Sequence, residues 1–445
     1  MNCRRYALLV LFLWPLAASA QSAQAPSSSS GNSAAPATLP DPLTLKEALA
    51  YADAPYPDTD VARANLADAQ ARERSAEADN HLELYADVTP AYVDPADPAL
   101  QPAQGDSAAQ LVLRQPLYDF GRTQAREKSL SETVAGRRLS LIDVQQRRRL
   151  EIMQAFFNVL LADLRYMVDN EAMAHAYVVF DRIRQRHEMG HVSDVDMAAA
   201  QSHYQDLLIR RTQSQTRQRL TRQRLASLLN HPGQLPANLE APTLNLDKRA
   251  DPDFDKLWGQ VKQKNPELLA LDRDLAAARE QVKLARAGAR PTLDAQLDAG
   301  AFQRPMGNRN VWGASINLHI PLYQGGRTDS AVAQAQAQLE RVRARRDGAL
   351  LSLRQTVVDL LEQLDVLKVR RKAAQVRGDY RELYLDRART LYELEKEVSL
   401  GDAMTRMTEA QWMTAQVKYD LAMTWARIDA LTGSLGGAKT EEKKP

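Results

Sequence analysis

One short motif occurs twice in this chain, and the repetition constrains the fold more than any other feature. A Pro-Leu-Tyr segment followed by Gly-Arg-Thr begins at Pro116 and again, about 205 residues later, at Pro321. Two other landmarks repeat at nearly the same offset: a proline-acidic pair at 57–58 and 266–267, and a Val-Ser pair at 192–193 and 398–399. Three landmarks in one order at nearly one offset indicate a tandem duplication.

The hydrophobic period changes in the same way within each copy. A helical period starts at the proline-acidic pair and then gives way to alternation of apolar and polar residues. In the second copy the alternation covers residues 292–299 and 311–320. In the first copy it covers residues 82–89 and a stretch through Leu111, Leu113 and Leu117. Each copy therefore predicts two strands of roughly ten residues, with one apolar and one polar face.

After each Pro-Leu-Tyr segment the helical period returns and continues for about 65 residues. At about 1.5 Å per residue, such a helix is roughly 100 Å long. Turn-forming residues at 190–194 and 395–401 then reverse the chain into a second helix. Each copy thus predicts a long helical hairpin.

The first 20 residues have the pattern of a secretory signal peptide. Two arginines precede an apolar stretch at 7–16, and a small-residue cleavage site follows at 18–20. The single cysteine, Cys3, lies in this leader, so the mature chain can form no disulfide and no thiolate metal site. Residues 21–40 are polar and rich in proline and serine, which predicts a disordered linker.

The remaining boundaries follow from the repeat. We expect a first repeat at 41–230, an inter-repeat linker at 231–255 that is rich in Pro, Asn and Asp, and a second repeat at 256–435. Each repeat should contain a helix, two strands and a helical hairpin. Residues 436–445 are predicted to form a disordered tail.

The charge balance argues against a nucleic-acid partner. Two of the 58 Lys and Arg residues lie in the leader, so the 56 that remain balance the 56 Asp and Glu residues. A neutral exported chain lacks the basic excess that polyanion binding needs. The arginine run at 147–149 and the arginines between 217 and 224 are therefore predicted to lie on solvated helix faces.

Four strands per chain are too few to close a membrane barrel. Lipid does not tolerate unpaired N–H and C=O groups at open strand edges, and small membrane barrels have about eight strands or more. Several chains must therefore pool their strands. The long helices have outer faces rich in Arg, Gln and Glu, so they must project into water as coiled coils. A pooled barrel that continues into a helical tube is a duct.

The sequence resembles the TolC-type outer membrane factors, the exit ducts of bacterial tripartite efflux pumps and type I secretion systems. The resemblance covers about residues 43–435, and several segments carry it together with both Pro-Leu-Tyr junctions: 43–49 (LTLKEAL), 265–268 (NPEL), 286–291 (RAGARP) and 190–193 (GHVS) followed by Asp196. It implies a homotrimer in the outer membrane with a large periplasmic portion. It also implies a twelve-stranded barrel, a mixed equatorial region, and hairpin tips that dock a periplasmic adaptor (membrane fusion) protein. An inner-membrane transporter would deliver the substrate, and no cofactor or metal is implied.

The fold class expected on both grounds is mainly α with membrane β. A long periplasmic α-helical coiled-coil barrel would join an outer-membrane β-barrel that takes four strands from each protomer, and the whole would be tandem duplicated. Four apolar strand residues are predicted to face lipid: Trp312, Ile316, Leu318 and Leu297. Their polar neighbours are predicted to face the lumen: Asp294, Asp298, Ser315 and Asn317.

Three further sets of residues are site candidates. The strand–helix junctions are corners in which a proline ends strand pairing and a glycine permits the bend, with the tyrosines at the membrane interface: Pro116, Tyr118, Gly121, Pro321, Tyr323 and Gly326. The adaptor-docking tips are Val192, Ser193, Val398 and Ser399; the serines alternatively serve as helix N-caps. Asp196 and Asp402 either cap the returning helices or form a periplasmic constriction, the latter implied for Asp402 by the resemblance.

Residues 187–191 (HEMGH) fit the HExxH zinc-protease signature. On a continuous helix the two histidines could hold zinc while Glu188 activates water. Here Gly190 and the turn residues after it predict that the helix stops, and the second copy has no histidine at 393–397. The sequence therefore favours a solvated hairpin tip and a protein that is not an enzyme. A soluble periplasmic coiled-coil protein is the other alternative.

Overall fold

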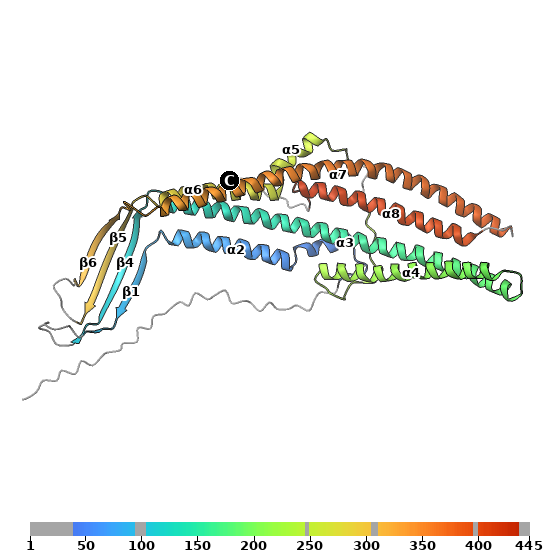
Figure 1. The fold of residues 1–445 in the computed structure, drawn as a ribbon, viewed down its shortest axis with the longest axis horizontal. Helices are drawn as coiled ribbons and strands as arrows, with labels where there is room; N and C mark the ends of the chain where they lie inside the picture. The colour runs from blue at the N-terminus through green and yellow to red at the C-terminus, as the bar shows by residue number, and fades with distance from the viewer. Residues whose placement is uncertain (1–38, 94–103, 245–248, 304–309, 395–398, 436–445) are drawn as a thin grey trace, which may run out of the picture.

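The computed structural model describes residues 39–93, 104–244, 249–303, 310–394 and 399–435. They form an elongated molecule with a four-stranded sheet at one end and long helices running away from it (Figure 1). The predicted leader, most of the predicted linker at 21–40 and the predicted tail lie outside the described residues. Leu39, at the end of that linker, is buried against the core.

The same series of elements occurs twice. The first series is α2 (Pro57–Ala78), β1 (Glu83–Thr89), β4 (Ala108–Tyr118), α3 (Arg122–Glu188) and α4 (Asp194–Leu228). The second is α6 (Pro266–Ala287), β5 (Thr292–Phe302), β6 (Trp312–His319), α7 (Arg327–Glu393) and α8 (Leu400–Leu431). Helices α3 and α7 have 67 residues each, close to the predicted 65, and are therefore about 100 Å long.

Several short elements lie outside this repetition. They are α1 (Leu45–Ala50), the 3-10 helix η1 (Tyr51–Asp53), the paired strands β2 (Tyr92–Val93) and β3 (Gln104–Gly105), and α5 (Phe254–Lys264). Helix α1 is fixed by a capping box in which Thr44 and Glu47 bond to each other's backbone N–H groups. The hydrophobic pattern of the sequence did not predict α1 or α5.

The hydrophobic core lies at the middle of the molecule. One cluster joins α1, α3, α4 and α8 through large buried side chains that include Ile152, Phe156, Phe157 and Leu225. A second joins α5, α6, α7 and α8 through residues that include Val261, Leu268, Val357 and Leu364. The ends of α4 and α8 and the short helices α1 and α5 meet α3 and α7 at these two clusters, a region that we call the waist. The waist holds the two repeats together (Figure 1).

Two arginines of this waist correct the expectation of solvated helix faces. Arg148 is only 3% exposed; one of its N–H groups donates to the Tyr51 carbonyl at 3.1 Å, and its guanidinium stacks on the Tyr56 ring. Arg222 donates to the carbonyls of Pro236 and Ala237. These side chains tie the carbonyls of η1 and of the segment after α4 to the long helices.

Among the described residues, none of the helices combines the length and the hydropathy that a bilayer-spanning helix requires.

Candidate channel surfaces

One face of the four-stranded sheet is apolar except at Gln115, which pairs with Ala295. The strand order is β1-β4-β5-β6, all antiparallel, and residues directly opposite each other point to the same face. The register therefore assembles one set, which we call the apolar face: Leu84, Ala86, Val88, Ala109, Leu111, Leu113, Leu293, Ala295, Leu297, Ala299, Trp312, Ala314, Ile316 and Leu318. The four residues predicted to face lipid all belong to it, and each is between 51% and 75% exposed in the protomer.

The opposite side of the sheet, the polar face, gathers the charged and amide residues. Asp294 pairs with Asn317 across β5 and β6, and Ser315 pairs with Gln296. Arg114 of β4 reaches Asp294 of β5, with 3.0 Å between the guanidinium nitrogen and the carboxylate oxygen. Separating apolar and polar side chains in this way suits a sheet with hydrocarbon on one side and water on the other.

The outer two strands of this sheet are β1 and β6. On their outward side the backbone N–H and C=O groups have no partner strand among the described residues. An exposed strand edge is a template for pairing with another chain.

At both strand–helix junctions the chain bends at a glycine whose backbone lies in the left-handed region of φ/ψ space. Gly121 and Gly326 are the N-caps of α3 and α7, with φ of +88° and +81°, which a residue with a side chain adopts only at a cost. The Asp119 carboxylate accepts hydrogen bonds from the amides of Gly121, Arg122 and Thr123. Partial burial acts to raise the pKa of Asp119, but these hydrogen bonds hold it below its usual value.

The prolines of the two junctions differ, which corrects the expectation that each ends strand pairing. Strand β6 ends at His319, before Pro321. Pro116 instead pairs with Asp294 inside the ladder, and a bulge lets Tyr118 pair with Leu293. A bulge leaves one residue unpaired and lets a proline sit in a strand. Tyr118 and Tyr323 are both exposed, the latter to 91%.

The hairpin tips show the serine caps that were one of the two alternatives. Ser193 Oγ accepts from the Asp196 amide at 3.2 Å, and Ser399 Oγ accepts from the Asp402 amide at 3.1 Å. Asp402 pairs with Arg406 one turn further along α8, with 2.7 Å between oxygen and nitrogen. Val192 is half-buried, whereas Val398 lies outside the described residues. These caps are compatible with adaptor docking at the tips and with a periplasmic constriction at Asp196 and Asp402.

His175, which the sequence did not identify as a site residue, links the two hairpins. His175 Nε2 of α3 lies 3.0 Å from Ser399 Oγ, the N-cap of α8. The imidazole also lies against the backbone of Gly401, where an added Cβ would approach Nδ1 to 2.4 Å. Nearby, the Thr408 hydroxyl donates to Glu171 at 2.7 Å. No local sequence pattern marks such a contact, because its partners are more than 200 residues apart.

The HEMGH segment does not lie on a continuous helix. Helix α3 ends at Glu188, and Gly190 takes a positive φ of 76°, as the turn residues predicted. His187 Nε2 lies 2.7 Å from Asp194 Oδ1 across the turn. Within the described part of the chain no three His, Cys, Asp or Glu side chains group as metal ligands.

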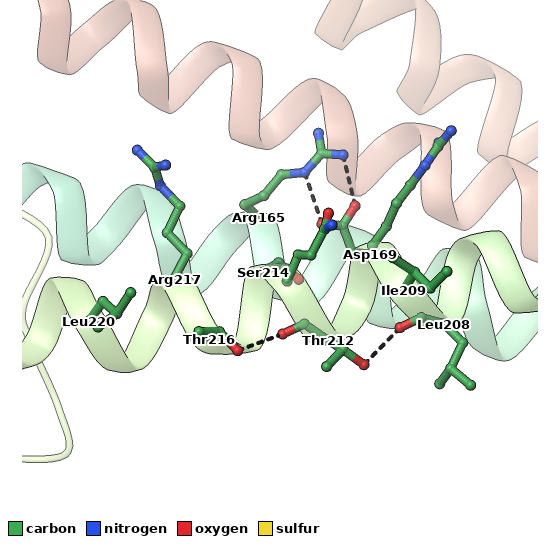
Figure 2. A pocket seen from close by; sticks show the side chains of 11 residues that line it. Arg165, Asp169, Leu208, Ile209, Thr212, Ser214, Thr216, Arg217 and Leu220 are labelled. Carbon is green, nitrogen blue, oxygen red and sulfur yellow. Dashed lines mark hydrogen bonds and ion pairs between the residues drawn. The ribbon is translucent and has the colours of Figure 1, made fainter.

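A groove of about 810 Å³ runs along α3 and α4 (Figure 2). Its charged pair is satisfied internally, because Arg165 donates to Asp169 at 2.8 and 3.1 Å. The apolar side chains of Ile209 and Leu220 are more than half exposed. The groove thus offers a packing surface.

Comparisons with known proteins agree with the arrangement of a strand sheet joined to long helical hairpins. The family model described as outer membrane efflux protein matches residues 257–434. Outer membrane protein TolC of Escherichia coli (strain K12) is 24% identical over 359 residues, covering 74% of this chain and 70% of that protein. The alkaline protease secretion protein AprF of Pseudomonas aeruginosa is 23% identical over 349 residues, with the same coverage of 74% and 70%.

The solved structures show the same fold. The Campylobacter jejuni CmeC outer membrane channel superposes with a TM-score of 0.74 at 14% identity, covering 88% of this chain and 86% of that chain. These similarities confirm both the family resemblance and the fold class predicted from the sequence.

Proposed function

We propose that the chain is a member of the outer membrane efflux protein family, whose model matches residues 257–434, and that three copies form the exit duct of a tripartite efflux pump or of a type I secretion system. Like its relatives, the protein is an outer membrane protein with a large periplasmic helical portion that serves efflux or secretion. The family consists of channel proteins rather than enzymes. We further propose that residues 41–230 and 256–435 are two copies of one ancestral repeat.

The observation that carries this proposal is the sheet with its open edges. An apolar face on which Trp312, Ile316 and Leu318 are each over half exposed in the protomer suits lipid. Lipid nevertheless excludes a strand edge with unpaired N–H and C=O groups. Pairing β6 of one protomer with β1 of the next removes both edges. Three chains with four strands each then close a barrel of twelve strands, within the size range of membrane barrels.

The long helices supply matching surfaces for three copies. The groove along α4 exposes Ile209 and Leu220, and α7 exposes Val369, Val376 and Leu383. Apolar side chains spaced along a water-facing helix are typical of a coiled-coil seam. We place the contacts between neighbouring protomers on these two surfaces.

The duct is passive and depends on its partners. An inner-membrane transporter delivers the substrate, and a periplasmic adaptor docks at the tips formed by Val192, Ser193, Val398 and Ser399. Asp196 and Asp402, which begin the returning helices, narrow the periplasmic end. The name of AprF refers to protease secretion and that of a Pseudomonas putida relative, TtgC, to toluene efflux, so the names of its relatives include both protein secretion and small-molecule efflux.

Cysteine pairs across the two edge strands test the closed trimer. Tyr85→Cys in β1 would be combined in turn with Gly313→Cys, Ser315→Cys or Asn317→Cys in β6. The native Cys3 lies in the predicted leader and would not interfere. We expect one register to bring Cβ atoms within about 4 Å and to give covalent dimers and trimers on oxidation.

The matched control pairs Tyr85→Cys with Gln296→Cys in β5, which is a central strand on the same polar face. This pair should give no cross-linked chains. Cross-linked products larger than three chains, or none in any register in membrane-inserted protein, would contradict the proposal.

A further inference from the structure

A basic pocket lies where the strands meet the helices. It has a volume of about 340 Å³ between the start of α3 and the end of α6. It is lined by Gly121, the N-cap of α3, by Lys128 of α3, by Lys283 and Arg286 of α6, and by Arg290 just beyond the end of α6. Four cationic side chains thus converge on one cavity.

One buried carboxylate positions two of these cations. Glu280 is 8% exposed, and its Oε1 lies 2.9 Å from Lys283 Nζ and 3.4 Å from Lys128 Nζ. The hydrogen bond from Lys283 holds the pKa of Glu280 below its usual value, against the opposing effect of burial. Glu280 therefore stays ionised and fixes both ammonium groups, while each keeps N–H donors for a ligand.

The pocket keeps an excess of positive charge. Glu280 offsets one of the four cations, and Arg286 forms no ion pair with any of the described residues. Arg290 Nη1 donates to the Phe120 carbonyl at 2.6 Å, which leaves its other N–H groups available. The first amides of α3 are not the donors, because Asp119 already accepts from them. The side chains are therefore the binding groups, and arginine and lysine suit phosphate.

The position of the pocket relative to the membrane–water interface indicates the class of ligand. Tyr118 ends β4, and its ring lies 4.7 Å from that of Phe120; such aromatic residues mark a membrane–water interface. Lys128 and Lys283 each lie seven residues beyond the junction residues Gly121 and Arg290, which is about 10 Å along a helix. Headgroup layers are about 5–8 Å thick on each side of the hydrocarbon. Arg290 at the junction and Arg286, four residues from it, therefore lie at the level of the headgroups, and the two lysines lie just beyond them on the periplasmic side.

We propose that this pocket binds the phosphate of an anionic phospholipid headgroup in the periplasmic leaflet of the outer membrane. The proposal rests on the proposed insertion of the sheet into that membrane. The bound lipid would fix the depth of the barrel at the point where rigid helices leave it.

The test measures phosphatidylglycerol bound to the detergent-purified trimer by native mass spectrometry. The variant Lys128→Gln with Arg286→Gln removes two charges but keeps the Glu280–Lys283 pair and the Arg290–Phe120 bond. Each basic residue near an anionic surface contributes about a factor of five in affinity, so we expect roughly 25-fold weaker binding. Arg286→Lys, which keeps the charge, should bind nearly as well as the wild type.

A control variant, Arg138→Gln with Arg341→Gln, makes the same charge change on α3 and α7. These exposed arginines lie about 20–25 Å along their helices from the junctions, beyond the headgroup layer, and binding should be unchanged. Equal losses in both double variants, no preference for phosphatidylglycerol over phosphatidylcholine, or complete displacement by inorganic phosphate would overturn the lipid site. The mass of the trimer and the cross-linking of the edge strands are measured separately, so failure of the duct proposal would be distinguishable from failure of the lipid-site proposal.

Discussion

Arginine at Ile316 and arginine at Ser315 should have very different consequences, although the two residues are neighbours in β6. Ile316 lies on the apolar face opposite Ala295, and Ser315 lies on the polar face opposite Gln296. In the proposed barrel the first side chain faces hydrocarbon and the second faces the water-filled lumen. The pair is therefore matched in strand, depth and introduced charge.

The expected free-energy cost of each arginine depends on which face of the sheet it occupies and on its depth in the bilayer. Ile316 is near the centre of the eight-residue β6, and an arginine near the bilayer midplane costs about 2–4 kcal/mol on the lipid face. Three copies per trimer raise the total to roughly 6–12 kcal/mol. Ser315→Arg adds a cation to a face that carries Asp294 and Asp298, and we expect a change within about 0.5 kcal/mol.

Both variants would be folded into lipid vesicles and unfolded with urea, and the trimer would be followed on unheated gels. Ile316→Arg should lower the free energy of unfolding and the trimer yield, while Ser315→Arg should resemble the wild type. Equal costs would refute the assignment of the two faces. The reverse order would mean that the register is displaced by one residue, because such a slip exchanges the faces.

Three other substitutions test separate parts of the proposal. Val192→Asp with Val398→Asp leaves both serine caps intact, so it should give a normal trimer that no longer cross-links to its adaptor; retained export would exclude docking at these valines. Glu188→Gln should leave transport intact, whereas a zinc enzyme would lose its general base; loss of function with normal assembly and normal adaptor binding would contradict the channel assignment. Gly121→Ala should cost about 1–2 kcal/mol because φ is +88°, while Gly348→Ala, with open space around it inside α7, should gain about 0.5–1 kcal/mol; thermal unfolding compares the two.

The parts of the fold that the sequence predicted are those governed by local periodicity. Alternation over 292–299 and 311–320 placed β5 and β6 on the correct residues and identified Trp312 and Ile316 as members of one face. The repeated glycines predicted the junctions because a left-handed residue is needed there whatever surrounds it. Turn residues predicted the ends of α3 and α7 for the same local reason.

The features that escaped prediction depend on tertiary contacts. Helix α5 owes its place to the packing of Leu257 and Val261 against α7 and α8, and eleven residues carry too weak a helical signal on their own. The neutral charge of the exported chain predicts that Arg148 lies on a solvated helix face. Its burial follows from carbonyls that η1 and α4 bring to α3. The contact of His175 with Ser399 likewise requires two helices from different repeats to meet.

The measurement that tests the central proposal most directly is the mass and location of the native assembly. Cells would be fractionated, and the protein would be extracted from the outer membrane in mild detergent and weighed by native mass spectrometry. We predict recovery in the outer membrane fraction at three times the mass of the mature chain. A monomer in mild detergent, or recovery in the soluble periplasm, would contradict a trimeric duct closed by pairing of β6 with β1.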